Sequence, residues 1–586
     1  MSRPQPVPSM DSLVGVDAKM QALAKLEALQ DEVSAALARR RSNGILRRAI
    51  VSWRRGDIVR AGKLALEASN ADDTNAKAYH VLGMALERMG HIHKALVTYE
   101  RAFQLDPDDA ELLINLGLIA WNLKQNEGAA RMFSLYIARC PDSPLGYNNL
   151  GSIQCDLGSP DQAIDTLTAA IYRMPNEAIL WNSLATVLAE NGRVEESLVF
   201  YNEAVRLEPK FARLHHNLGY AYSHLGRLDE ALASYDRALE TVVDPAERLE
   251  TTHSRSICLI GMGKLEEGFS EFETRNHPRF RAFLKHVLKA PQWKGEDLAG
   301  KRIAVVGEQG LGDEFMFATV LPDIQRAVGD AGKLYIAVDP RLVPLFQRSF
   351  PKAEVGAYDD RTLLDPNGNE ALRFIKFVTD KQEPDFWSPM GSALQYLRKS
   401  LADFPHETFL KADPERTKSM RGLLEAKGEG PFVGICWRSM MLGAKRAKYY
   451  SPLDLWAPIL TTPGVTFVNL QYGDCAAEIA HVKETLGVDV SVLDVDLKDD
   501  IDGAAALSAA VDLVISAPTA AAANAGAVGT EVWFVTAGRT WPQLGTDEYP
   551  WYRKSHVYSP DKFADWNELM PRIARDLAAF AAKRKG

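Results

Sequence analysis

The chain has 586 residues, of which 46% are hydrophobic and 25% charged, a composition typical of a globular protein with roughly two or three domains. Its formal net charge of -9 argues against a general affinity for DNA, RNA or anionic membranes. The five cysteines lie far apart without a C-x-x-C pair, which speaks against both a disulfide framework and a zinc site.

Residues 1–41 combine a proline-rich tail with a charged amphipathic helix over 11–41. The tail lacks the apolar core of a signal peptide. No apolar run reaches the roughly 18 uninterrupted residues of a membrane span, so we expect a cytoplasmic protein without membrane insertion. The helix either caps the segment that follows it or pairs with a second copy as a homo-oligomer, and the sequence leaves both alternatives open.

Residues 42–277 repeat with a period of 34 residues. A small residue recurs once in each of six repeats: Ala49, Gly83, Gly117, Gly151, Ala185 and Gly219. In the last five repeats a large residue follows sixteen positions later: Tyr99, Phe133, Leu167, Tyr201 and Tyr235. We therefore predict two amphipathic helices in each repeat, crossing closely at the small residue, with the large residue filling the groove between neighbours.

This spacing is similar to the tetratricopeptide pattern, with six repeats in register and a degenerate seventh in "SRSICLIGMGKLEEGFSEFETR". A single helical hairpin of this kind cannot bury its apolar face alone. The repeats are therefore expected to stack into an all-α superhelical solenoid with a long concave surface, and such surfaces usually bind peptides.

One position of the repeats carries an amide three times, in Asn115, Asn149 and Asn217, with Ser183 at the equivalent place between them. Stacked asparagines can pair with the backbone of an extended peptide, which makes these three candidate residues for binding an acceptor polypeptide. The alternative is that asparagine is simply common at this position of such repeats, and it stays open.

Three groups invite a metal-binding interpretation. The histidines of His91–His93 and His215–His216 have no acidic or cysteine neighbours and are predicted to be surface or packing residues. The short Asp494–Asp496 motif, "DVD", carries too little information to indicate a metal site. We predict no metal ligands in this chain.

After a linker over 278–299, strand-like runs alternate with helices in two series. The first series contains "RIAVVG", "KLYIAV" and "RFIKFVT", and the second contains "PFVGICW", "VTFVNLQYG", "VSVLDVD", "DLVISA" and "EVWFVTAG". They predict two doubly wound α/β lobes, over 300–408 and 409–586, with a ligand cleft at the carboxyl ends of the strands.

The stretch "GEQGLGDEF" joins the first of these strands to a helix. Gly310 and Gly312 let the backbone approach a phosphate or a sugar, but the third glycine of a dinucleotide site and the Gly-Lys-Ser/Thr of a P-loop are both missing. Asp313 either acts as a base on an acceptor hydroxyl or caps its own helix, and the residues alone favour the cap.

The second lobe offers a candidate phosphate site in "DLVISAPTAAAANAGAVG". A strand ends at Ser516, Pro518 suits a first helical turn, and the Thr519 hydroxyl and free backbone N–H groups begin a helix that also holds Asn524. The loop "CWRSMMLGAKRAKYYS" adds candidate ligands for phosphate or carboxylate: Arg438, Ser439, Lys445 and Arg446. For the last two, a solvated basic loop is an equally good interpretation.

Several stretches in combination resemble bacterial tetratricopeptide proteins with a glycosyltransferase domain of the two-lobed GT-B type. They are "PQWKGEDLAGKRIAVVGEQGLGDEFMFATVLP", "VGICWRSM", "DLVISAPTAAAANAGAVGTEVWFV" and "YPWY". The resemblance covers about residues 42–584, and the domain is similar to heptosyltransferases and, more distantly, to O-GlcNAc transferase. It implies two Rossmann-like lobes, with the last helix crossing back onto the first lobe.

The "CWRS" loop with its following lysine, arginine and tyrosines resembles most the flagellin glycosyltransferases, which transfer nonulosonic acids such as pseudaminic or legionaminic acid from CMP to Ser or Thr of flagellin. The resemblance implies that Asp313 is the catalytic base. It also implies that Thr519 and its helix bind the nucleotide phosphate, and that Arg438 binds the phosphate or the sugar carboxylate. In this interpretation the repeats capture flagellin, and no cofactor is needed beyond the nucleotide-sugar donor.

One departure from the family bears on the donor. Heptosyltransferase-like proteins usually carry Asp-Thr-Ser-x-x-His at the second-lobe helix, whereas this chain has Pro518–Ala523, "PTAAAA". The lost aspartate and histidine disfavour ADP-heptose or a UDP-sugar, but not a CMP-sugar, which needs fewer phosphate partners. Two alternatives stay open: a non-catalytic scaffold or chaperone for flagellin or another client, and a transferase acting on lipopolysaccharide or small glycans.

Overall fold

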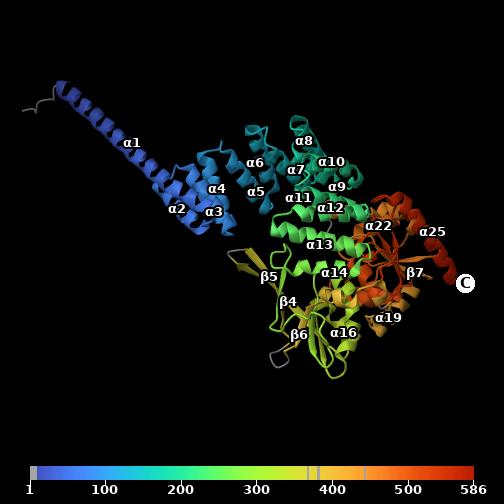
Figure 1. The fold of residues 1–586 in the computed structure, drawn as a ribbon. Coiled ribbons are helices and arrows are strands. Elements are labelled where there is room, and N and C mark those ends of the chain that lie inside the picture. Colours follow the sequence, from blue (N-terminus) through green and yellow to red (C-terminus); the bar gives the residue numbers. More distant parts are fainter. Residues whose placement is uncertain (1–9, 366–367, 379–382, 405, 441–443, 586) are drawn as a thin grey trace, which may run out of the picture. The chain divides into compact units, whose positions relative to one another are not determined.

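The computed structural model describes residues 10–365, 368–378, 383–404, 406–440 and 444–585 (Figure 1). The chain forms two compact units: Met1–Leu157 with Leu364–Asn369, and Gly158–Leu363 with Glu370–Gly586. Among the described residues, no helix has both the length and the apolar character needed to cross a membrane.

The first unit is built mainly from successive helices joined by short turns. They are α1 (Met10–Arg54), α2 (Ile58–Ala71), α3 (Ala76–Arg88), α4 (Ile92–Leu105), α5 (Ala110–Asn122), α6 (Asn126–Arg139) and α7 (Pro144–Asp156). α1 runs past the predicted boundary at residue 41, because it continues unbroken into the first helix of the first repeat. The side chains of residues 18–37 are all exposed, so this stretch does not cap the repeats.

The second unit begins with the remaining repeat helices. They are α8 (Pro160–Arg173), α9 (Ala178–Glu190), α10 (Val194–Leu207), α11 (Ala212–His224), α12 (Leu228–Thr241), α13 (Pro245–Gly261) and α14 (Leu265–Phe272). The degenerate seventh repeat predicted from the sequence corresponds to α13 and α14. The protein thus has an N-terminal all-helical repeat region, as predicted.

The predicted pairing of small and large residues is confirmed in both units. A methyl group added to Gly83 would lie 2.5 Å from the ring of Tyr99, and one added to Gly219 would lie 2.9 Å from the ring of Tyr235. Tyr99 and Tyr235 are themselves fully buried. At these two positions, therefore, only glycine leaves room for the ring as it is placed.

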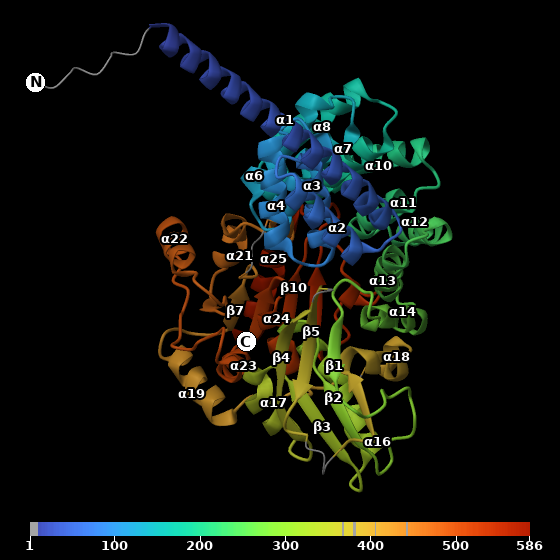
Figure 2. The same cartoon turned by 90° about the vertical axis from the view of Figure 1, so that its left-hand side faces the viewer.

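The repeats are followed by a six-stranded sheet with the order β1-β5-β4-β3-β2-β6 (Figure 2). Its strands are β1 (Leu284–Val287), β2 (Arg302–Val306), β3 (Lys333–Val338), β4 (Glu354–Asp365), β5 (Gly368–Ile375) and β6 (Phe386–Pro389). The pairs β1–β5, β2–β3, β2–β6 and β3–β4 are parallel. Strands β4 and β5 follow one another after only two residues, which requires an antiparallel pair. The sheet is therefore mixed.

This sheet forms the first lobe, together with α15 (Leu311–Phe317), α16 (Leu321–Val328), α17 (Val343–Ser349) and α18 (Leu394–Leu397). Two predictions need correction here. The segment 278–299 is more than a linker, because it supplies β1. The helix predicted in "GSALQYLRKSLADF" is only the short α18, because the Arg398 side chain turns inward and donates to Asp323 at 2.7 Å.

The second lobe is built on a five-stranded parallel sheet with the order β11-β10-β9-β7-β8. Its strands are β7 (Phe432–Cys436), β8 (Thr466–Asn469), β9 (Leu513–Ser516), β10 (Val532–Val535) and β11 (Ser555–Tyr558). Its helices are α19 (Pro414–Glu425), α20 (Ala444–Ala447), α21 (Ala457–Leu460), α22 (Ala476–Leu486), α23 (Ile501–Ala510), α24 (Ala520–Ala527) and α25 (Trp566–Lys585). This order reverses direction between β7 and β9, where doubly wound folds bind ligands.

Two further predictions are wrong in the second lobe. The strand predicted in "VSVLDVD" is reduced to a single bridge between Val468 and Ser491. The last helix, α25, does not cross to the first lobe. Its apolar residues Leu569, Ile573 and Leu577 belong to the core of the second lobe, because that core exposes an apolar face which α25 covers.

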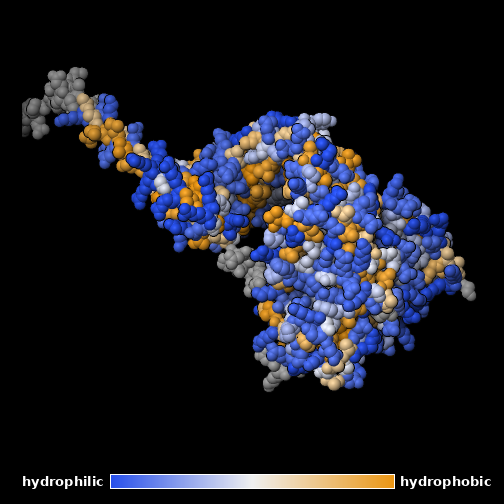
Figure 3. Space-filling model, viewed as in Figure 1, coloured by the Kyte–Doolittle hydropathy of each residue, from blue (hydrophilic) through white to orange (hydrophobic). Residues whose placement is uncertain are grey.

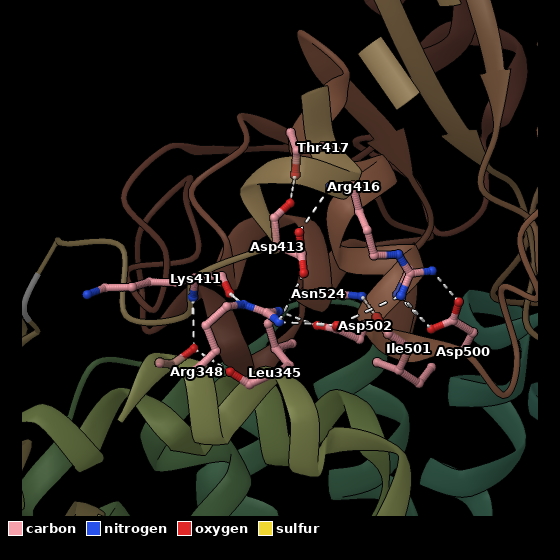
Figure 4. Close-up of polar contacts among 12 residues, drawn as sticks. Leu345, Arg348, Lys411, Asp413, Arg416, Thr417, Asp500, Ile501, Asp502 and Asn524 are labelled. Atoms are coloured by element: carbon pink, nitrogen blue, oxygen red, sulfur yellow. Dashed lines mark hydrogen bonds and ion pairs between the residues drawn. The ribbon is translucent and has the colours of Figure 1, made fainter. Parts of the chain in front are cut away.

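Two arginine–aspartate pairs hold α23 in place (Figure 4). Arg348 of α17 forms an ion pair with Asp502 of α23, and Arg416 of α19 forms one with Asp500 at the start of α23. The first pair links the two lobes. It holds α17 of the first lobe against α23, which in turn packs beside α24.

Candidate active site

A cavity of ≈ 590 Å³ lies between the loop that follows β2 and the loops that follow β7 and β9. Most of the residues predicted to act on a ligand line it: Gly310, Gly312, Asp313, Ser439, Arg446, Thr519 and Asn524. We call it the interlobe cavity. Its position matches the switch point of the second sheet, which explains why the loops that follow β7 and β9 meet there.

Asp313 lies in the first turn of α15 and its carboxylate reaches back to the start of the helix. The backbone N–H of Gly310 donates to Asp313 Oδ2 at 3.2 Å. Burial raises the pKa of Asp313 to about 6, with a smaller contribution from the negative charge of Glu308, while the hydrogen bond from Gly310 opposes this rise. Asp313 therefore caps its helix, and its carboxylate, with a raised pKa, also lines the cavity; its role as a base stays a prediction.

The two lobes approach each other closely at the glycine pair. A methyl group added to Gly312 would lie 3.8 Å from the Cα atom of Ala520, the first residue of α24. The turn carrying Asp313 therefore lies directly against the N-terminal end of α24. Gly310 precedes α15 with extended backbone angles, φ -108° and ψ 169°, which other residues also adopt, and a methyl group added there would lie 3.6 Å from Asp313 Oδ2, so neither backbone strain nor a steric clash requires glycine at this position.

The α24 N-terminus forms the opposite wall. Thr519 is its N-cap residue. The N–H groups of the first helical turn have no intrahelical partner, as in any helix, and the Thr519 side chain does not cap them. Pro518 lies one residue before the N-cap, not in the first turn as predicted. Free N–H groups and the positive end of the helix dipole make this wall suited to an anion.

Asn524 lies one turn into α24 and is 2% exposed. Its Nδ2 donates to the Ile501 carbonyl at 3.5 Å (Figure 4), whereas its Oδ1 is buried without a partner among the described residues. A buried, unpaired amide oxygen costs free energy unless something donates to it. Since Asn524 lines the interlobe cavity, a ligand hydroxyl or amino group is a suitable donor.

Arg438, predicted to bind phosphate or carboxylate, does not line the interlobe cavity. Its guanidinium forms an ion pair with Glu478 of α22, and its Nη2 also donates to the Asp474 carbonyl at 3.0 Å. Trp437 Nε1 donates to the same Glu478 carboxylate at 2.8 Å. The charge of Arg438 is therefore neutralised by Glu478 of α22. The "CWRS" motif alone could not reveal this partner, because Glu478 lies in a different segment of the sequence.

The rest of the basic loop divides into three cases. Ser439 lines the cavity beside Tyr450 and Tyr472. Arg446 lines it with an exposed side chain. The Lys445 side chain lies outside the described residues.

Sequence reasoning missed several residues of this cavity. Arg341 follows β3, and Lys498 precedes α23. Behind the cavity Tyr549 and Tyr552 stack on Phe534, with ring centroids 4.1 and 6.0 Å apart. The two tyrosines belong to the "YPWY" stretch, which contributed to the family resemblance but indicated no role for them. The loops that carry Arg341 and Lys498 contain no recognisable motif.

A buried ion pair fixes the glycine-rich loop to the end of the repeats. Arg275, which follows α14, donates to both oxygens of Glu308, from Nε at 2.9 Å and from Nη2 at 2.8 Å. The side chains of both residues are 6% exposed. The Gly391 N–H also donates to Glu308, at 2.6 Å. The loop that carries Asp313 is thereby anchored to the repeat region.

Two of the three candidate asparagines make hydrogen bonds between repeats. Asn115 Nδ2 lies 2.9 Å from His80 Nε2, and Asn217 Nδ2 donates to Asn182 Oδ1 at 2.9 Å. Asn149 is 6% exposed, and its amide nitrogen is buried without a partner in the described part of the chain. These contacts give Asn115 and Asn217 a role in stacking the repeats, and the peptide-binding role of all three asparagines stays a prediction.

The histidines pack as predicted. His215 Nε2 lies 2.8 Å from the Pro209 carbonyl, and His216 Nδ1 lies 3.0 Å from Thr251 Oγ1. Within the described residues, His80, Asp109 and Glu111 are the one group close enough to hold a metal ion. Both ring nitrogens of His80 are already engaged, one by Asp109 at 3.1 Å and the other by Asn115, so the group is explained as packing.

Comparisons with known proteins agree with the repeat assignment. A family model described as "TPR repeat" matches residues 185–226, and models described as "Tetratricopeptide repeat" match residues 80–144 and 212–241. Repeats of this class generally mediate protein–protein interactions.

Two solved structures are similar to the repeat region. A tetratricopeptide repeat protein from Parabacteroides merdae is 16% identical, covering 40% of this chain and 91% of that chain, with a TM-score of 0.36. TTC0263, a thermophilic tetratricopeptide protein of Thermus thermophilus, is 27% identical, covering 30% of this chain and 98% of that chain, with a TM-score of 0.28.

A relative matches the repeats and both lobes together. Protein FlbA of Caulobacter vibrioides is 39% identical over 539 residues, which cover 92% of this chain and 90% of that protein. Identity at this level over nearly the whole of both chains establishes common descent. The chain therefore belongs to the family of tetratricopeptide-repeat proteins that includes Protein FlbA.

Proposed function

We propose that this chain is an inverting protein O-glycosyltransferase, with a GT-B pair of lobes, that acts on a polypeptide held by the repeats. The single observation that carries the proposal is the interlobe cavity. One of its walls bears a carboxylate with a pKa of about 6, and the other is an open helix N-terminus. These are the two groups that sugar transfer from a nucleotide requires, a base and an anion site.

In the proposed reaction, Asp313 takes the proton of a serine or threonine hydroxyl as that oxygen attacks the anomeric carbon of the sugar. The bond between the sugar and the phosphate oxygen breaks, and the nucleotide leaves with the electron pair. The N–H groups of α24 and the cations Arg446 and Lys498 stabilise the charge that develops on this phosphate. The Asn524 amide oxygen accepts a hydrogen bond from the nucleotide-sugar.

A mutation in α24 tests the donor site. Ala521 lines the cavity in the first turn of α24, so Ala521→Asp adds a carboxylate that suits the helix dipole but repels a phosphate. We expect wild-type protein to bind CMP, and Ala521→Asp to bind it at least about tenfold more weakly in calorimetry. Ala521→Ser is the matched control and should bind normally. Failure of the wild-type protein to bind CMP or UDP would refute the proposed function.

For the donor and the acceptor, we propose a CMP-linked nonulosonic acid and flagellin. The proposal rests on the resemblance of the "CWRS" loop to flagellin glycosyltransferases, and on an anion site without the aspartate and histidine of heptosyltransferase-like proteins. Mass spectrometry of flagellin from cells with and without this gene tests it. A flagellin mass independent of the gene would exclude this acceptor.

A non-catalytic scaffold is the second candidate, and one observation favours it. Arg438, which the resemblance assigns to the donor, is committed to Glu478 outside the cavity. A scaffold predicts binding of the client polypeptide by the repeats without binding of any nucleotide, so the same calorimetry separates the two functions.

The exposed stretch of α1 is proposed to pair with a second copy of the chain. Five apolar side chains recur there at spacings of three and four residues: Leu23, Leu26, Leu29, Val33 and Leu37. Their exposed fractions are between 56% and 66%, and Figure 3 shows apolar residues along this helix. A lone helix does not keep such a stripe in water, whereas two copies bury it in a short coiled coil.

Two lysines on the stripe test this pairing. Leu26→Lys with Val33→Lys should convert a dimer to a monomer in sedimentation equilibrium, because paired helices would bury the new charges. Ala24→Lys with Asp31→Lys, on the opposite side of α1, should leave the dimer intact. A monomeric wild-type protein at micromolar concentration would contradict the pairing.

A further inference from the structure

A second cavity adjoins the interlobe cavity. It has a volume of ≈ 560 Å³ and lies between the repeat helices α11, α12 and α13 and the loops of the second lobe. We call it the repeat chamber. On one side it is closed by Tyr449, whose hydroxyl lies 2.8 Å from His224 Nε2, and by Phe563, which stacks on His224 with ring centroids 6.2 Å apart.

The chamber and the interlobe cavity are adjacent and share part of their lining. Arg446, Tyr450, Pro518 and Trp541 line both of them. A polypeptide that reaches Asp313 from the repeats along these shared residues would place one of its side chains in the chamber. Since successive residues of an extended chain advance about 3.3 Å, a side chain seated in the chamber belongs to a residue only a few positions from the reacting hydroxyl.

The chamber walls favour an uncharged, apolar occupant. They include Leu228, Ile257, Ala537, Trp541 and Phe563, and no carboxylate or lysine lies among the described lining residues. A cationic side chain would lose its water here without gaining a partner of opposite sign, and an anionic one would find only Arg446 and Arg539. An aliphatic or aromatic side chain would instead gain the free energy of burial.

One polar atom of the wall lacks a partner. His253 lines the chamber, and its Nδ1 is buried without a hydrogen bond in the described residues. Its ring packs on Phe272 and Phe280, with centroids 5.4 and 5.1 Å apart, and burial lowers the pKa of His253 to about 4, so the ring is neutral. A neutral imidazole nitrogen can accept a hydrogen bond from a backbone N–H of an extended peptide.

We propose that the repeat chamber is an acceptor subsite, which binds an aliphatic or aromatic side chain a few residues from the serine or threonine to be modified. This assignment rests on the proposed glycosyltransferase function and adds a selection rule to it. The asparagines of the repeats would read only the backbone of an acceptor, whereas the chamber selects among its side chains.

The test uses the full-length protein with CMP present and fluorescent peptides that have a central serine. The residue two positions from the serine is phenylalanine, leucine, glycine or aspartate. We expect the phenylalanine and leucine peptides to bind at least about tenfold more tightly than the glycine peptide in anisotropy titrations, because burial of such a side chain is worth at least that factor. Equal affinities, or no binding of any peptide up to millimolar concentration, would overturn the assignment.

Chamber variants locate the preference. Ser254 is half-buried on the chamber wall, so Ser254→Trp should fill the chamber and reduce binding of the phenylalanine peptide to that of the glycine peptide. Val243→Trp adds the same ring at a residue that is 93% exposed and should change nothing. Ser254→Glu should transfer the preference to an arginine peptide, which covers the case in which the tryptophan variant misfolds. A phenylalanine preference that survives both changes would place the site elsewhere.

Failure of this inference and failure of the proposed function give different results. CMP binding without side-chain preference rejects the subsite and leaves the transferase. A side-chain preference without binding of CMP or UDP rejects the transferase and identifies the chamber as a peptide site of a scaffold.

Discussion

Replacing Asp313 by asparagine is expected to abolish sugar transfer, with a loss of at least about a thousandfold in kcat/KM, while CMP binding stays within about twofold of wild type. The amide keeps the size of the carboxylate and still accepts the hydrogen bond from Gly310, so the loop is preserved, but it cannot take a proton from the acceptor. Single-turnover transfer assays and calorimetry measure the two quantities. Transfer at the wild-type rate would remove Asp313 as the base.

The pH dependence gives this prediction a second readout. With the pKa of Asp313 at about 6, transfer by the wild-type protein should fall as the pH drops below about 6, because the carboxylate becomes protonated. Asp561→Asn, which removes an exposed carboxylate, is the matched control and should retain both the activity and its pH profile.

Asp313→Asn should also stabilise the protein. The folded-state pKa of Asp313 is raised from 3.8 to about 6, so ionisation of the buried carboxylate opposes folding, and this cost is complete above pH 6 and absent below pH 4. We expect Asp313→Asn to raise the free energy of unfolding by on the order of 1–3 kcal/mol at pH 8, with the gain vanishing towards pH 4. Urea titrations at both pH values measure it, and a gain that does not depend on pH would contradict the stated cause.

The largest loss of stability is expected from Arg275→Met. The methionine fills part of the space but leaves the buried Glu308 carboxylate without its guanidinium partner, and such a change typically costs about 3–5 kcal/mol. In the wild-type protein, burial acts to raise the pKa of Glu308, but Arg275 holds it below its usual value. Without it the pKa of Glu308 should rise, so the loss should grow between pH 4 and pH 7.

A double-mutant cycle separates the ion pair from simple packing. Arg275→Met combined with Glu308→Gln should recover most of the lost stability, because no unpaired charge remains. Additive losses in the double variant would mean that the two side chains do not interact. Because Glu308 lies in the loop that carries Asp313, Arg275→Met should also lower kcat more than it lowers donor binding.

The repeats could be predicted in detail because each depends on contacts local in sequence. The pairing of Gly83 with Tyr99 joins residues of two helices in one repeat, so a fixed spacing encodes it. The strands β2, β3, β7, β8, β9 and β10 were predicted because each is a short apolar run. Strands β1, β4, β6 and β11 were missed. Three of them, β1, β6 and β11, are four-residue strands at the edges of their sheets, and β4 carries the charged run Asp359–Arg361, so none of the four is a long apolar run in sequence.

The sequence by itself determined the repeat register, the two sheets and the candidate carboxylate, because spacing and apolar patterning record local structure directly. Only the tertiary structure decided which polar groups share a site. It removed Arg438 from the cavity by pairing it with Glu478, and it brought Arg341 and Lys498 in. The physical reason is that a charged side chain takes the nearest partner that desolvation permits, and that partner comes from another element of the fold.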